Sequence, residues 1–157
     1  MKNIKNKILI IILSFLILGC SKSATSLFDR DPIYGQNIQY SKIIKVLDKD
    51  IVKAIFNITY LNSVDSKKWD NNNTQNFLIG VYSSDNNNSK YQLTMNNLQY
   101  LKSLPIKKED ELSQNIAFEN HWATYNLVSF PNTKQNIVKL TYTYDNNQTI
   151  STTFLKE

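Results

Sequence analysis

Short runs in which apolar and polar residues alternate constrain the fold of this chain more than any other feature. The run at residues 52–60 reads VKAIFNITY, and the run at 137–144 reads IVKLTYTY. A period of two places successive side chains on opposite faces of a β-strand. Each run therefore predicts a strand with one buried face and one exposed face.

The same alternation, or a run of apolar and β-branched residues, predicts further strands. They cover residues 41–47, 77–83, 91–95, 122–130 and 150–154. The stretch FLIGVYS at 77–83 is apolar on both faces, which is typical of a central strand. One short helix is expected at 107–114 (KKEDELSQ), after Pro105. Residues 98–104 fit either helical turns or an edge strand.

Segments rich in Asn and Asp separate these patterns. Those at 85–88 and 145–147 each join two neighbouring strand patterns. Asn and Asp suit tight turns, so both segments are predicted to be hairpin loops. Short strands separated by turns predict an all-β fold, an antiparallel β-sandwich of about seven to eight strands with at most one short helix.

The first twenty residues have the pattern of a secretory signal. Three lysines precede an apolar run at 8–18 that is broken only by Ser14. That run is shorter than the roughly 20 residues of a membrane-spanning helix, but it suits the apolar region of a signal peptide. It ends in the sequence ILGC at 17–20.

This ending resembles the lipobox of bacterial lipoproteins, with Gly19 and Cys20 at its two most restrictive positions. Ile17 and Leu18 differ mildly from the usual Leu and small residue. The resemblance implies that Cys20 receives a diacylglycerol, that cleavage precedes it and that its amine is acylated. Ser21, in place of Asp, favours the outer membrane. The alternative is an ordinary secreted protein whose cysteine lies near the cleavage site by accident.

The expected organisation is a signal peptide at 1–19, a lipidated polar tether at 20–36 and a β-sandwich domain at 37–157. Loss of the three signal-peptide lysines lowers the formal net charge from +5 to +2, so no nucleic-acid partner is expected. Because Cys20 is the only cysteine, a lipidated chain forms no disulfide.

The layout of the strand patterns resembles immunoglobulin-like and fibronectin-type III domains. The segment NHWATY at 120–125 is similar to one in small immunoglobulin-like lipoproteins of AT-rich Gram-negative bacteria. The chain lacks the cysteine pair of antibody-type domains. The resemblance implies an immunoglobulin-like sandwich in the cell envelope.

Catalytic and metal-binding signals are weak. His121 is the single histidine, and no GxSxG turn supplies a nucleophile beside it. Without a second histidine or a free cysteine, no zinc site of nitrogen and sulfur ligands can form. The acidic run at 109–111 is interpreted as the solvated face of a helical turn rather than a calcium site. We therefore expect no enzyme, metal or cofactor.

Two tryptophans are candidate binding residues. Trp69 lies in the polar sequence SKKWD and is predicted either to cap the sandwich or to be an exposed contact, whereas Trp122 precedes a strand. Exposed tryptophans are frequent binding hot spots.

Three loops share the pattern Asp-X-Asn-X-Ser/Thr, with Asn72, Asn87 and Asn147 at its centre. The pattern resembles the extended N-glycosylation signal of certain Gram-negative bacteria. The composition predicts roughly 0.3 such matches by chance, although turns also concentrate Asp, Asn and Ser. The three asparagines are therefore candidate glycosylation sites in loops.

These features favour a non-enzymatic binding module that is anchored to a membrane through Cys20 and meets an unknown protein or host-surface partner. The most specific form of this hypothesis is a surface adhesin. The alternatives are a periplasm-facing accessory lipoprotein of an envelope complex and a hydrolase that uses His121.

Overall fold

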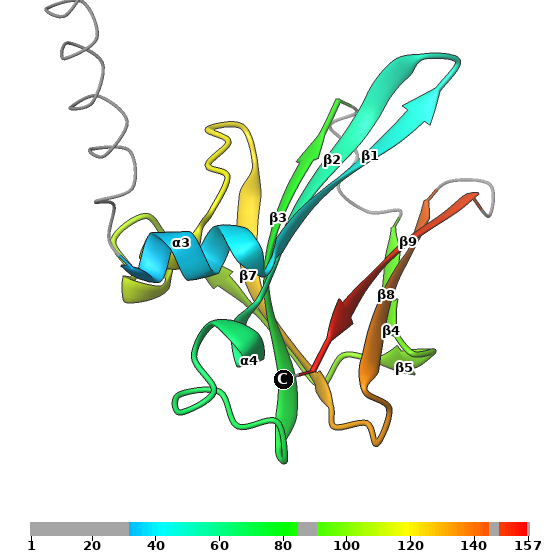
Figure 1. Ribbon diagram of the computed structural model, residues 1–157. Helices are drawn as coiled ribbons and strands as arrows, with labels where there is room; N and C mark the ends of the chain where they lie inside the picture. The colour runs from blue at the N-terminus through cyan, green and yellow to red at the C-terminus, as the bar shows by residue number, and fades with distance from the viewer. Residues whose placement is uncertain (1–31, 85–90, 145–147, 157) are drawn as a thin grey trace, which may run out of the picture. The chain divides into compact units, whose positions relative to one another are not determined.

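A computed structural model describes residues 32–84, 91–144 and 148–156. The chain divides into two compact units, Met1–Pro32 and Ile33–Glu157, and the following description concerns the second. Its described residues form nine strands in two antiparallel sheets, with one apolar core between them. The predicted all-β sandwich is confirmed (Figure 1).

The larger sheet has five strands in the order β1-β2-β3-β7-β6. They are β1 (Ser41–Asp48), β2 (Ile51–Tyr60), β3 (Thr74–Ser83), β7 (Thr124–Pro131) and β6 (Lys102–Ile106). The smaller sheet has four strands in the order β5-β4-β8-β9. They are β5 (Leu98–Gln99), β4 (Gln92–Met95), β8 (Ile137–Tyr144) and β9 (Gln148–Leu155).

The strand order is that of an immunoglobulin-like sandwich. Immunoglobulin constant domains place strands A, B, E and D in one sheet and C, F and G in the other. In this chain β2, β3, β7 and β6 occupy the A, B, E and D positions, and β4, β8 and β9 occupy the C, F and G positions. β1 extends the first sheet beyond the A position, and β5 extends the second beyond C.

One of the two predicted hairpins is wrong. β3 pairs with β2 and β7, whereas β4 pairs with β5 and β8. Because β3 and β4 belong to different sheets, they do not form a hairpin. The hairpin of β8 and β9 is confirmed by their pairing from Ile137↔Leu155 to Tyr144↔Gln148. The loops themselves lie outside the described residues.

The helices differ most from expectation. The predicted helix at 107–114 is wrong, because only the 3₁₀ helix η1 (Glu111–Asn115) forms there. The segment 98–104 forms no helical turns; instead of one edge strand it contains β5 and the start of β6, which are edge strands of different sheets. Two α-helices were not predicted, α3 (Pro32–Gln39) and α4 (Leu61–Val64). α3 includes residues 32–36, which the sequence assigned to the tether.

Aromatic rings join the two sheets across the core. The rings of Phe56 on β2 and Tyr142 on β8 lie 4.0 Å apart between centroids. Phe154 on β9 lies 5.7 Å from both Tyr60 and Phe77 on the opposite sheet. All five side chains are buried, so the aromatic contacts occupy the centre of a sandwich in which no disulfide links the sheets.

The outer face of the five-stranded sheet carries a second, polar layer. Asn37 of α3 is fully buried, and its Oδ1 accepts a hydrogen bond from Asn115 Nδ2 at 3.1 Å. On β2, Asn57 Nδ2 donates to the carbonyl oxygen of Phe118 at 2.8 Å. Paired amides of this kind satisfy buried polar groups. The first bond joins α3 to η1, and the second joins the segment 107–123 to the sheet.

Candidate functional site

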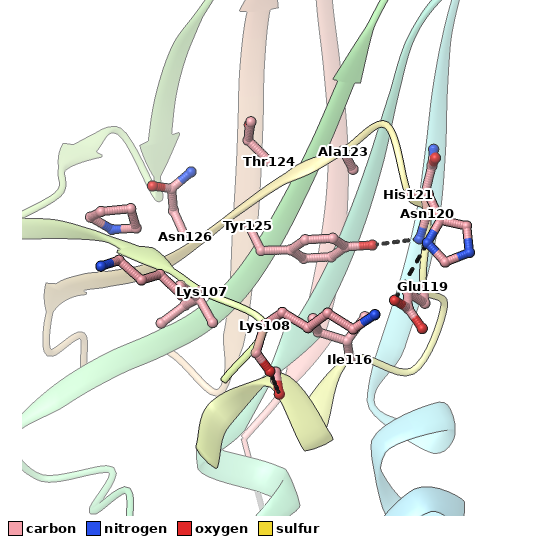
Figure 2. A pocket seen from close by; sticks show the side chains of 13 residues that line it. Lys107, Lys108, Ile116, Glu119, Asn120, His121, Ala123, Thr124, Tyr125 and Asn126 are labelled. Atoms are coloured by element: carbon pink, nitrogen blue, oxygen red, sulfur yellow. Dashed lines mark hydrogen bonds and ion pairs between the residues drawn. The ribbon is translucent and has the colours of Figure 1, made fainter. Parts of the chain in front are cut away.

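A cleft of about 530 Å³ lies beside the segment 107–123. Its walls come from the end of β6, the start of β7 and that segment (Figure 2). The cleft brings together residues that are far apart in sequence, including Ile106, Ile116, His121 and Tyr125. A concave site lined by apolar groups and a few polar groups is typical of binding sites.

The floor of the cleft depends on a close contact between Tyr125 of β7 and Gly80 of β3. The two residues are paired in the sheet, and a Cβ atom at Gly80 would lie 2.3 Å from Tyr125 Cε1. Only glycine leaves room for the ring. The Tyr125 hydroxyl donates to Phe118 O at 3.1 Å. It also accepts from the Asn120 N–H at 2.8 Å (Figure 2). One ring therefore fastens the loop to the sheet.

Asn120 closes the turn that presents Trp122. Its Oδ1 accepts the Trp122 N–H at 3.0 Å, and its carbonyl oxygen accepts the Ala123 N–H at 3.0 Å. The Trp122 side chain is 81% exposed, and its two chain neighbours line the cleft. The predicted contact residue thus stands at the rim on a hydrogen-bonded turn.

Lys107 and Lys108 give the cleft a positive side. The Lys107 N–H donates to Asp110 Oδ2 at 2.8 Å, and Ser113 Oγ donates to Lys108 O at 2.9 Å. These bonds hold the backbone of two lysines that both line the cleft. With Glu119 as the one carboxylate of the lining, the cleft suits a polar or anionic group.

His121 lies at the same rim with its side chain 79% exposed. Its Nδ1 is 3.7 Å from Glu119 Oε1. Among the described residues, no serine or threonine hydroxyl is hydrogen-bonded to this imidazole. A hydrolase of the kind considered above needs a nucleophile in contact with its base.

Trp69 lies apart from this cleft, in a second one that it lines with Lys68 and Glu111. It is half-buried, and its carbonyl oxygen accepts from Asn62 Nδ2 at 3.1 Å. Lys68 Nζ and Glu111 Oε1 form an ion pair at 3.0 Å. The two candidate tryptophans therefore belong to different places: Trp69 lines this second cleft, whereas Trp122 stands between two residues that line the first.

Two members of the acidic run at 109–111 bond to other groups of the chain, Asp110 to the Lys107 N–H and Glu111 to Lys68 Nζ. Within the described ranges, no group of three or more His, Cys, Asp or Glu side chains could hold a metal ion. In the same part of the chain, no helix has the length and apolar character to span a membrane.

Among the three glycosylation candidates, the structure describes Asn72. It is exposed in the turn before β3. Its N–H donates to Asp70 Oδ1 at 2.8 Å, and its carbonyl oxygen accepts from Asn132 Nδ2 at 3.0 Å. Asn87 and Asn147 lie outside the described residues, as does Cys20.

The chain matches no protein-family model, no curated protein and no solved structure. The cleft itself was not predicted from sequence. One signal for it was present, because a glycine within the apolar run FLIGVYS marks a close approach to a strand. Its partner, Tyr125, is 45 positions away along the chain and carries no such mark.

Replacing Gly80 with alanine should force the Tyr125 ring off the sheet. We expect Gly80→Ala to lower the free energy of unfolding by about 1–3 kcal/mol, as overpacked sites do, measured by urea denaturation. The matched control is Gly35→Ala in α3, where an added Cβ meets nothing within 4 Å. That variant should be neutral or slightly more stable. Equal losses of unfolding free energy in the two variants would contradict a special role for the contact between Gly80 and Tyr125.

Proposed function

We propose that this chain is a lipid-anchored lipoprotein of the cell envelope, and that its sandwich acts as a non-enzymatic binding module. The observation that carries this proposal is Trp122, which is 81% exposed at the rim of the cleft. A tryptophan buries a large area when it meets a partner, and such residues dominate many interfaces. The partner is an unknown protein or a host-surface molecule.

The turn around Trp122 supports binding because it is already ordered. Asn120 and Tyr125 hold it through four hydrogen bonds, between 2.8 and 3.1 Å long. A preorganised contact loses less conformational entropy when it binds. Lys107 and Lys108 of the adjoining cleft add positive charge that can orient the partner.

The sharper form of the proposal is a surface adhesin in the outer membrane, held through acylated Cys20. Two or more acyl chains make such an anchor durable. The main alternative is an accessory lipoprotein that faces the periplasm and steadies an envelope complex. A hydrolase using His121 has the least support, because the imidazole is exposed and its described partner is the Glu119 carboxylate rather than a nucleophile.

Protease treatment of intact cells tests the location, and adherence of the same cells tests the function. A surface adhesin should release peptides from the domain while periplasmic markers stay intact. Cells carrying Trp122→Ala should lose most of their adherence to host-cell monolayers. Leu101→Ala is the matched control, because Leu101 is also exposed, at 64%, and should leave adherence unchanged.

Two outcomes would contradict the adhesin. If the protein is cut only after the outer membrane is opened, it faces the periplasm and the alternative stands. If cells that lack the protein adhere as well as wild-type cells, it contributes no adhesion.

We also propose that at least one of Asn72, Asn87 and Asn147 carries a glycan in the native host. Support comes from the exposed turn at Asn72 and from the threefold recurrence of the pattern. The intact mass of native protein should exceed that of peptide plus lipid, and Asn→Gln variants at the three positions should remove the excess. A native mass equal to peptide plus lipid would overturn this proposal.

A further inference from the structure

Another cavity, of about 250 Å³, lies between the two sheets, separate from the two clefts described above. Its apolar walls are Ile79 and Val81 of β3, Leu93 of β4 and Val128 of β7, all buried. Tyr100 and Ser103 line its more exposed side. The cavity therefore reaches from the apolar core to solvent.

The hydroxyl of Tyr142 is the unusual feature of this cavity. Tyr142 lines it and is fully buried. Its oxygen atom has no hydrogen-bond partner in the described part of the chain and is closed off from a water-sized group, so an occupant of the cavity reaches it only when the side chains around it shift. A buried hydroxyl without a partner costs free energy, and nearly all such groups in proteins are satisfied.

The other lining residues determine whether the cavity favours a charged or a neutral ligand. Among the described residues, the lining contains no Asp, Glu, Lys, Arg or His side chain. Burial raises the pKa of Tyr142 well above its usual value, and the nearby Tyr91 adds to the rise. Burial likewise raises the pKa of Tyr91. Both phenols are therefore neutral at pH 7, and such a lining disfavours a charged ligand.

The tyrosines are held in place by their neighbours. Phe56 lies 4.0 Å from the Tyr142 ring and 5.7 Å from the Tyr91 ring, between centroids. Tyr100 meets Phe130 edge-on at 6.3 Å. An apolar cavity of about 150 Å³ is enough to hold benzene, so this one has room for a single ring or a short alkyl chain.

We propose that the space between the sheets is a binding site for a small neutral molecule with an apolar body and one polar group, which hydrogen-bonds the Tyr142 hydroxyl after the side chains that cover it shift. This site is independent of the cleft beside Trp122, so either proposal can fail while the other stands.

Phenol, toluene and benzoate test the site directly. The protein is residues 20–157 with Cys20→Ser, which contains the whole compact unit from Ile33 to Glu157. Binding is followed by NMR through the methyl groups of Val81, Leu93 and Val128. We expect saturable shifts with phenol and toluene, and none with benzoate.

Two variants distinguish the contribution of the Tyr142 hydroxyl to binding from that of the cavity itself. Tyr142→Phe should weaken phenol binding by about two- to tenfold, the worth of one hydrogen bond, while toluene binding stays equal or improves. Because the hydroxyl has no partner, this variant should unfold at the same or a higher urea concentration. Ser103→Trp, at an exposed position, should block both ligands and leave the circular dichroism spectrum unchanged.

Several results would overturn the proposal. The absence of shifts with phenol and toluene up to their solubility limits would mean that the cavity holds only water. Equal phenol affinity in Tyr142→Phe, or a marked loss of stability in that variant, would show that the hydroxyl is not the ligand's partner. Shifts confined to residues of the cleft would place the binding elsewhere.

Discussion

The contact between the Phe56 and Tyr142 rings is the interaction on which the rest of this structure depends. It joins β2 of one sheet to β8 of the other at 4.0 Å, in a sandwich whose sheets no disulfide links. Aromatic pairs contribute about 0.5–1.5 kcal/mol beyond the area that they bury. With Phe154 against Tyr60 and Phe77, such contacts fix how the two sheets face each other.

Strand β7 connects this core to both candidate sites. Its alternation directs Tyr125 to the outer cleft and Val128 to the cavity between the sheets, and Asn126 lines both. The outer surface of the sheet is itself covered, because buried amides such as Asn57 hold the loop that carries Trp122. A rigid sheet with an ordered loop on its outside is well suited to presenting a contact surface.

The strands could be predicted from sequence because their signal is local. Alternation at 52–60 and 137–144 reports which side of a strand is buried, and β2 and β8 follow it. Strand order could not be predicted, since the pairing of β3 with β7 depends on residues some 50 positions apart. The hairpin of β3 and β4 was wrongly predicted for the same reason, because the sequence does not show which sheet the next strand joins.

The helices and the cleft could not be predicted, because no clear pattern in the sequence marks them. α3 contains Gly35 and several polar residues, and it is held by the buried Asn37 rather than by an apolar stripe. The predicted helix at 107–114 is instead a turn followed by the 3₁₀ helix η1, because Asp110 Oδ2 accepts a hydrogen bond from the Lys107 N–H. Trp122 could be named as a contact from its residue type alone, but its turn and the Gly80–Tyr125 contact appear only in three dimensions.

A double-mutant cycle between Phe56→Leu and Tyr142→Leu tests the central role of the aromatic core most directly. Urea unfolding of the wild type, both single variants and the double variant should give a coupling energy of about 0.5–1.5 kcal/mol. The same cycle between Phe56→Leu and Phe130→Leu should give about zero, because β3 places their partners, Val81 and Gln75, six residues apart. Additive effects of Phe56→Leu and Tyr142→Leu would contradict the account and show that the two sheets are held together by other contacts.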